Sequence, residues 1–153
     1  MRTLIVLIAL AMGFSTQCEA TELMGPARFC GYSPIIDLLP GEKVTTLDGG
    51  IHGGRFRWEG AFGTLDVNGI GWASRPPGQI VEAQTSTKPA RFAQRQVDGG
   101  YVVAIWNGSH GAAYFKSATS LTPNQITAIN RVTLFEWGET PTACDLQTIF
   151  SWE

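Results

Sequence analysis

Hydrophobic and polar residues alternate along much of the chain with the two-residue period of β-strands. Arg55–Trp58 alternates cleanly, which predicts a strand with one face in solvent and the other in the core. Tyr101–Trp106 is apolar at almost every position, and this favours a central strand that is covered on both faces. Both runs are rich in the β-branched and aromatic residues that strands prefer.

Glycine-containing turn sequences separate these runs at short intervals. A two-residue Asn-Gly turn between apolar runs is a strong local signal for a hairpin. Such closely spaced turn signals favour an antiparallel meander. We predict hairpin turns at Asp48-Gly49-Gly50, Asn68-Gly69, Asp98-Gly99-Gly100 and Asn107–Gly111.

One segment departs from the strand pattern. Thr122 is followed by Pro123 and, three residues after the threonine, by Gln125, which is the form of a capping box. Apolar residues then recur at a spacing of three, and we expect a short helix near residues 123–131. Two late strands are predicted to follow this helix, over Val132–Trp137 and Leu146–Trp152. Near the start of the chain, Ser33–Pro40 is predicted to be an irregular or single-turn helical segment. The fold class that follows is mainly β, an antiparallel meander that forms a single sandwich or barrel with one helix packed on it.

The first twenty residues have the pattern of a secretory signal peptide. Arg2 provides a positive charge, Leu4–Phe14 is an almost unbroken apolar run, and a short polar stretch ends at the small residue Ala20. The apolar run would span roughly 16 Å as a helix, against roughly 30 Å for a bilayer core. We therefore expect cleavage after Ala20, a secreted or periplasmic location, a mature single all-β domain over 21–153, and no transmembrane segment after cleavage.

Removal of the signal changes the cysteine count. Cys18 would leave with the signal, so the exported chain would keep Cys30 and Cys144. A cysteine pair in an oxidising compartment is most simply a disulfide, and this one would tie the start of the domain to its end. A free nucleophilic thiol is the alternative.

Composition narrows the class of partner. The chain has 11 basic and 13 acidic residues and a net charge of −2, so neither sign dominates. This balance argues against binding to nucleic acid or to an anionic membrane. Hydrophobic residues make up 44% and charged residues 16%, which is typical of a globular domain.

Two histidines are candidates for chemistry. His52 and His110 both lie among glycines in predicted turns, and together with a carboxylate such as Asp48, Asp66 or Glu59 they could form a metal or hydrolase site. Neither histidine has a second ligand at the spacing of a known metal motif, and an ordinary polar turn explains both. No cofactor is predicted.

Exposed aromatic and basic residues are candidates for binding. Most of the five tryptophans are expected to be buried, and Trp72 is the best candidate for exposure because it precedes a proline-rich loop. Arg55 and Arg57 share a strand face, as do Arg91 and Arg95. If the two strands are neighbours, these arginines form a basic patch that could bind an acidic partner. A solvated sheet face is the alternative.

Two functions follow from these features. The first is an exported, non-catalytic binding or inhibitor-like domain with a protein or carbohydrate ligand, which would be bound by the loops at Asp48–Gly54, Ser74–Gly78 and Asn107–Gly111. The second is a small secreted hydrolase or metal-dependent enzyme that uses His52 and His110. A filled interior with neither a groove nor an exposed aromatic would favour a structural role instead.

Overall fold

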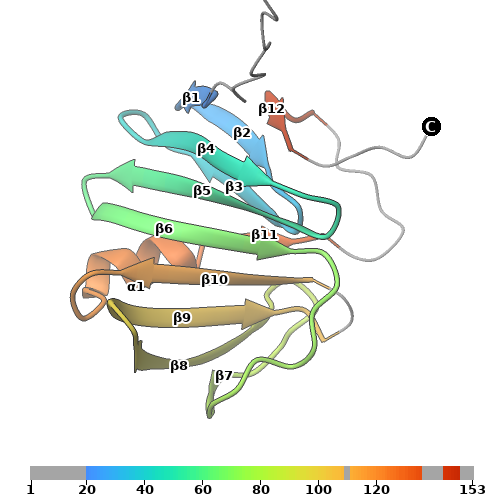
Figure 1. Ribbon diagram of the computed structural model, residues 1–153, viewed down its shortest axis with the longest axis vertical. Coiled ribbons are helices and arrows are strands. Elements are labelled where there is room, and N and C mark those ends of the chain that lie inside the picture. Colours follow the sequence, from blue (N-terminus) through green and yellow to red (C-terminus); the bar gives the residue numbers. More distant parts are fainter. Residues whose placement is uncertain (1–19, 109–110, 136–142, 149–153) are drawn as a thin grey trace, which may run out of the picture.

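The structure is a computed structural model that describes residues 20–108, 111–135 and 143–148 (Figure 1). Within these residues an eight-stranded sheet has the order β1-β4-β5-β6-β10-β9-β8-β7, and a four-stranded sheet has the order β11-β3-β2-β12. The strands are β1 (Glu22–Met24), β2 (Ala27–Cys30), β3 (Pro34–Leu38), β4 (Lys43–Gly49), β5 (Gly53–Gly60), β6 (Gly63–Ile70), β7 (Ile80–Glu82), β8 (Ala90–Val97), β9 (Gly100–Trp106), β10 (Ala112–Ser117), β11 (Thr133–Leu134) and β12 (Leu146–Gln147).

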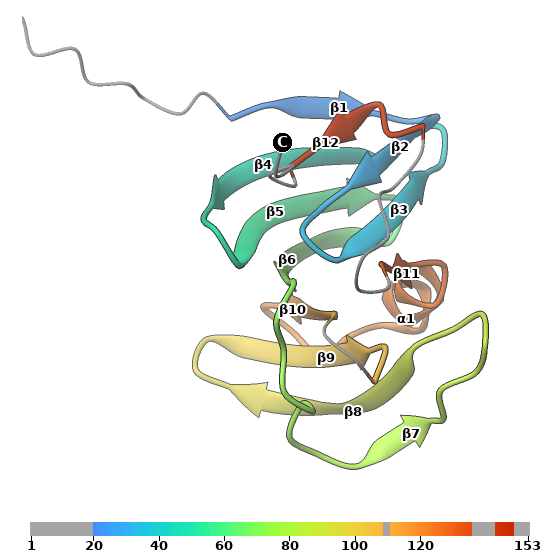
Figure 2. The same cartoon turned by 90° about the vertical axis from the view of Figure 1, so that its right-hand side faces the viewer.

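The two sheets are stacked in layers, which confirms the predicted mainly β class in its sandwich form. The smaller sheet and the helix α1 (Pro123–Ile129) lie on the same side of the large sheet (Figure 2). We call the side of the large sheet that faces away from them the outer face. All strand pairs are antiparallel except β2 with β12, which run parallel. The topology differs from a simple meander, because β6 pairs with β10 instead of with the next strand.

The core lies between the two layers. One alternating set of side chains from the large sheet meets the smaller sheet and α1, and it includes the fully buried Trp58 and Phe115. On β5, Phe56 and Trp58 point into this core while Arg55 and Arg57 are exposed, as the alternation predicts. β9 lies between β10 and β8 with four consecutive buried residues, which confirms the prediction of a covered central strand.

Three of the four predicted hairpins are present. β8 and β9 are joined at Asp98-Gly99, and β9 pairs with β10 across the 107–111 connection. β4 and β5 also pair, but Asp48 and Gly49 belong to β4 and the turn lies two residues later than predicted. A register shift between Thr46 and Asp48 carries the strand through this glycine-rich segment.

The turn predicted at Asn68-Gly69 is wrong. Both residues lie inside β6, which is paired without interruption to β5 on one side and to β10 on the other. Gly69 is needed here for space, since a Cβ atom at this position would lie 2.7 Å from Cδ of Pro34 in the smaller sheet. The β5–β6 turn lies at Ala61-Phe62 instead, before Gly63, whose φ is +94°.

The segment Ser33–Pro40 is also not irregular or helical, because Pro34–Leu38 forms β3. Its neighbours are β2 and β11, and its burial alternates as in a strand with one covered face. The two late strands are present in shortened form as β11 and β12, and their predicted continuations at 136–137 and 149–152 lie outside the described residues.

The helix begins where the sequence indicates. The hydroxyl of Thr122 accepts from the backbone N–H of Gln125, and the Gln125 side chain accepts from the N–H of Thr122, which completes the capping box. The helix ends at Ile129, two residues before the predicted end, and its buried residues include Ala128 and Ile129. These side chains join the common core between the layers.

A second, smaller cluster lies on the outer face. Phe92 is fully buried there and is joined by Trp106 and Tyr114. The connection from β6 to β7 covers it, passing across the ends of β10, β9 and β8 (Figure 2). Within this connection the Arg75 guanidinium lies 5.8 Å from the centre of the Phe92 ring, and Pro76 is fully buried.

The predicted disulfide joins the two ends of the described chain. Cys30 at the end of β2 is bonded to Cys144, with their Cα atoms 5.8 Å apart and a sequence separation of 114. The bond lies beside the parallel pair β2–β12. It therefore holds the last strand of the smaller sheet to one of its first strands.

Candidate functional site

The connections that follow β4, β6 and β9 emerge at the same end of the large sheet. Antiparallel pairing makes these three strands run in the same direction, and this end is on the right in Figure 1. The three loop segments predicted to carry binding therefore start from one end of the sheet, although they are far apart in sequence.

At this end lies an exposed aromatic and apolar group. Trp72 is 63% exposed and its ring centre lies 6.1 Å from that of His52. The N–H of Gly71 donates to the carbonyl of His52 at 3.0 Å, which ties the β4–β5 turn to the segment after β6. Ile51, in the same turn, is 69% exposed. We call Ile51, His52 and Trp72 the loop-end patch.

The tryptophans separate by burial. Trp58 is completely buried, Trp106 is half-buried, and Trp72 is exposed, as the sequence predicts for it. Trp137 and Trp152 lie outside the described residues. A role for Trp72 in binding stays a prediction.

The second predicted site would pair His52 with His110, and His110 lies outside the described residues. His52 lies against Trp72. Within the described ranges, no group of three histidine, cysteine or acidic residues is arranged to hold a metal ion. The three carboxylates suggested for such a shell each have a cationic partner: Asp48, Asp66 and Glu59 form ion pairs with Arg55, Arg57 and Lys43, respectively. A paired-histidine site therefore stays a prediction.

The predicted basic face of β5 is neutralised locally. The Nε of Arg55 donates to Asp48 at 2.7 Å, and the Nε of Arg57 donates to Asp66 at 2.9 Å. The hydrogen bond from Arg55 lowers the pKa of Asp48 below its ordinary value, and the same bond raises the pKa of Arg55. Each pair joins adjacent strands on the outer face, so these arginines carry little unbalanced charge.

The further prediction that Arg91 and Arg95 share a face is wrong. A register shift between Phe92 and Arg95 inserts one residue, so Arg91 faces the helix side and Arg95 faces outward. Nor is β8 a neighbour of β5, because β6, β10 and β9 lie between them.

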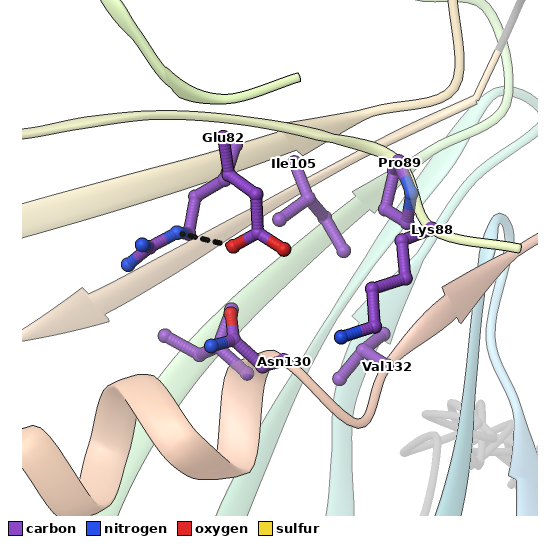
Figure 3. A pocket seen from close by; sticks show the side chains of 8 residues that line it. Glu82, Lys88, Pro89, Ile105, Asn130 and Val132 are labelled. Atoms are coloured by element: carbon purple, nitrogen blue, oxygen red, sulfur yellow. Dashed lines mark ion pairs between the residues drawn. The ribbon is translucent and has the colours of Figure 1, made fainter. Parts of the chain in front are cut away.

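Arg91 lines a small cavity between β8 and the end of α1 (Figure 3). Its Nε lies 3.3 Å from a carboxylate oxygen of Glu82, and Lys88 and Asn130 also line the cavity. The free space is about 10 Å³, which is room for a single water molecule. This cavity is therefore too small for a ligand.

A wider concavity lies on the outer face over β6, β8, β9 and β10. Its volume is about 390 Å³, within the range of roughly 300–1,000 Å³ that is usual for small-ligand sites. We call it the outer-face groove. Its lining includes Asn68, Arg95, Asp98, Val102, Tyr114 and Lys116.

Sequence reasoning did not identify this groove. The alternation on β10 does place Tyr114 and Lys116 on one face, opposite the buried Phe115. Their neighbours across the strands, however, come from the β6–β10 pairing, which joins segments more than forty residues apart. No local pattern indicates that pairing.

Asn107-Gly108-Ser109 matches the acceptor sequence for N-glycosylation, but the side chain of Asn107 has a structural role. Asn107 is buried, its Nδ2 donates to the carbonyl of Phe135 at 2.6 Å, and its Oδ1 accepts from the N–H of Gly111 at 3.0 Å. Its amide therefore supports the β9–β10 connection and is not presented to solvent.

Among the described residues, no helix is long and apolar enough to span a membrane. Comparisons of the chain with protein-family models, with curated proteins and with solved structures each found no match.

Proposed function

We propose that the protein is an exported, non-catalytic domain that binds a partner protein, in the manner of an inhibitor, through the loop-end patch. The observation that carries this proposal is the exposure of two large apolar side chains, Trp72 at 63% and Ile51 at 69%, in connections that start from the same end of the large sheet. Large apolar side chains are costly to leave in water, and tryptophan is among the residues most often found at the energetic centre of protein interfaces.

The chemistry of the patch favours a protein over a sugar as its ligand. A sugar is usually held by an aromatic platform together with side chains that hydrogen-bond its hydroxyls. In this patch His52 can hydrogen-bond, whereas Ile51, its neighbour in sequence, and Trp72 contribute mainly apolar area, which suits a protein interface better than a row of sugar hydroxyls. The backbone bond from Gly71 to His52 joins the two segments, which lowers the entropy lost when a partner binds.

Two further features support export of such a domain. The first twenty residues have the charge and apolar pattern of a cleavable signal. The disulfide between Cys30 and Cys144 is of the kind that forms and persists in oxidising compartments.

The magnitude of the Trp72 contribution can be approximated. A tryptophan buries roughly 200 Å² in an interface, and 63% exposure leaves roughly 130 Å² to be covered. At about 25 cal/mol per Å² this corresponds to about 3 kcal/mol, and about 2 kcal/mol would be measured after side-chain ordering. Truncation to alanine should therefore weaken binding roughly 30-fold.

The test compares variants that alter the patch with one that alters another exposed apolar position. The exported protein, Trp72→Ala and Ile51→Ser are immobilised and exposed to extracellular and periplasmic fractions of the source, and bound proteins are quantified. Val81→Ser is the matched control, because Val81 is 51% exposed on the edge strand β7. Circular dichroism establishes that every variant is folded.

We expect a partner protein to be retained by the wild type and by V81S, and not to be retained by W72A or I51S. Equal retention by W72A would refute the proposal. A glycan array run in parallel covers the other ligand class, and W72-dependent binding to a glycan would replace the protein partner by a carbohydrate. Turnover of a hydrolase substrate that depends on His52 would favour the enzyme instead.

A further inference from the structure

The lining of the outer-face groove holds two cations, Arg95 and Lys116, and one carboxylate, Asp98, so its net charge is positive. Arg55 and Arg57 are each paired with an aspartate on the next strand. Arg95 and Lys116, which line the groove, form no ion pair within the part of the chain that the structure describes. Two cations without carboxylate partners in a concavity attract an anionic group.

The strand register sets the spacing of these two cations. Lys116 lies opposite Val102, and Val102 lies opposite Arg95, so the three residues form one row across β10, β9 and β8. Two strand spacings of about 4.8 Å place the two cationic residues about 10 Å apart, with the small apolar Val102 as the floor between them. A carboxylate on a compact ligand could therefore be reached by both side chains.

The remaining lining residues indicate what the rest of the ligand is. Tyr114 is half-buried and lies beside Asn68 across the β6–β10 pair, which combines an aromatic ring with an amide that both donates and accepts. Asp98 adds a carboxylate that accepts hydrogen bonds from hydroxyl groups and repels a dense polyanion. The other two lining residues, Ile70 and Val97, are apolar and can contact the carbon atoms of a sugar ring. A ligand with many hydroxyls and isolated carboxylates satisfies the polar groups.

From this arrangement we propose that the outer-face groove binds an oligosaccharide that contains uronic acid, with Arg95 and Lys116 on its carboxylate and Tyr114 and Asn68 against the sugar ring. An acidic peptide fits less well, because the backbone groups of these central strands already pair with one another and leave none for the peptide main chain. The proposal is independent of the protein-binding function of the loop-end patch.

The test is titration of the ¹⁵N-labelled protein with trigalacturonate, followed by NMR and by calorimetry. The control ligand is the same trisaccharide with its carboxylates reduced to alcohols, and a triglutamate peptide represents the acidic-peptide alternative. Arg95→Gln and Lys116→Gln are compared with Lys43→Gln, which removes a charge from the same face at an ion-paired position on β4, away from the groove. Trp72→Ala separates this groove from the loop-end patch.

We expect millimolar or tighter binding of trigalacturonate, with resonance shifts concentrated in β6, β8, β9 and β10. R95Q and K116Q should each weaken binding about tenfold, the loss of one charge-assisted hydrogen bond, while K43Q and W72A should stay within about twofold of wild type. Absence of binding at millimolar ligand, equal binding of the reduced trisaccharide, or preferential binding of triglutamate would overturn the proposal. So would a loss of binding in W72A, because it would move the ligand to the loop-end patch.

Discussion

Replacement of Gly69 by alanine tests whether this glycine serves packing between the sheets or a turn. The added Cβ would lie 2.7 Å from Cδ and 3.2 Å from Cγ of Pro34, a rigid ring that is fully buried. The two sheets would have to separate locally, and such overpacking costs about 1–3 kcal/mol. Alanine also restricts the unfolded chain more than glycine does, and this lower unfolded-state entropy offsets about 0.4–1 kcal/mol of that cost. The free energy of unfolding should therefore fall by about 1–2 kcal/mol, or roughly 3–10 °C in Tm.

The assay is urea and thermal unfolding of the disulfide-bonded protein, with Gly50→Ala as the matched control. Gly50 lies in the β4–β5 turn, has no positive φ, and has no atom within 4 Å of the position that a Cβ would take. G50A should therefore leave stability unchanged or raise it slightly. The reasoning would be refuted if G69A unfolded at the wild-type midpoint, or if G50A were destabilised as much as G69A.

Three further predictions concern stability. Glu42 is buried, and its carboxylate accepts hydrogen bonds from Arg131, from the indole N–H of Trp58 and from the backbone N–H of Leu39. E42A should therefore lower the free energy of unfolding in urea by about 3–5 kcal/mol, and E42Q, which keeps an acceptor, should lower it clearly less. A hydrogen bond from Arg28 lowers the pKa of Asp37 in the folded state, so this pair stabilises the protein above about pH 4 and its contribution is lost as the pH falls. D37N should therefore flatten the fall of the unfolding free energy between about pH 4 and pH 2. The difference should be only tenths of a kcal/mol, because the pair is exposed. Replacing Cys30 and Cys144 together by serine should lower the free energy of unfolding by about 2–5 kcal/mol. Mass analysis that found both thiols free in the wild-type protein would contradict the bond itself.

The elements predicted correctly are those whose signals are local. The capping box of Thr122 and Gln125 acts within four residues, and the helix begins where this pattern places it. The alternation of Arg55–Trp58 likewise predicts which side chains are buried, because a strand turns successive side chains to opposite faces whatever its neighbours are. The exposure of Trp72 follows from its place before a proline-rich loop.

The incorrect predictions come from local signals that tertiary packing overrides. Asn68-Gly69 has the composition of a turn, yet β6 continues through it because β5 and β10 pair on both sides and Pro34 approaches closely. The separation of Arg91 from Arg95 depends on an inserted residue that only the pairing of β8 with β9 determines.

The sequence by itself determined that this chain builds a layered β domain with one capped helix, and it indicated the disulfide and the segments from which a binding surface would come. Only the tertiary structure decided that β6 pairs with β10, and this pairing brings Asn68 beside Tyr114. The pairing of β10, β9 and β8 aligns Lys116 with Arg95 in the same groove. Side-chain periodicity and capping act between near neighbours and can be recognised in the sequence. The order of strands depends on which distant surfaces pack best together, and the groove exists only as a result of that order.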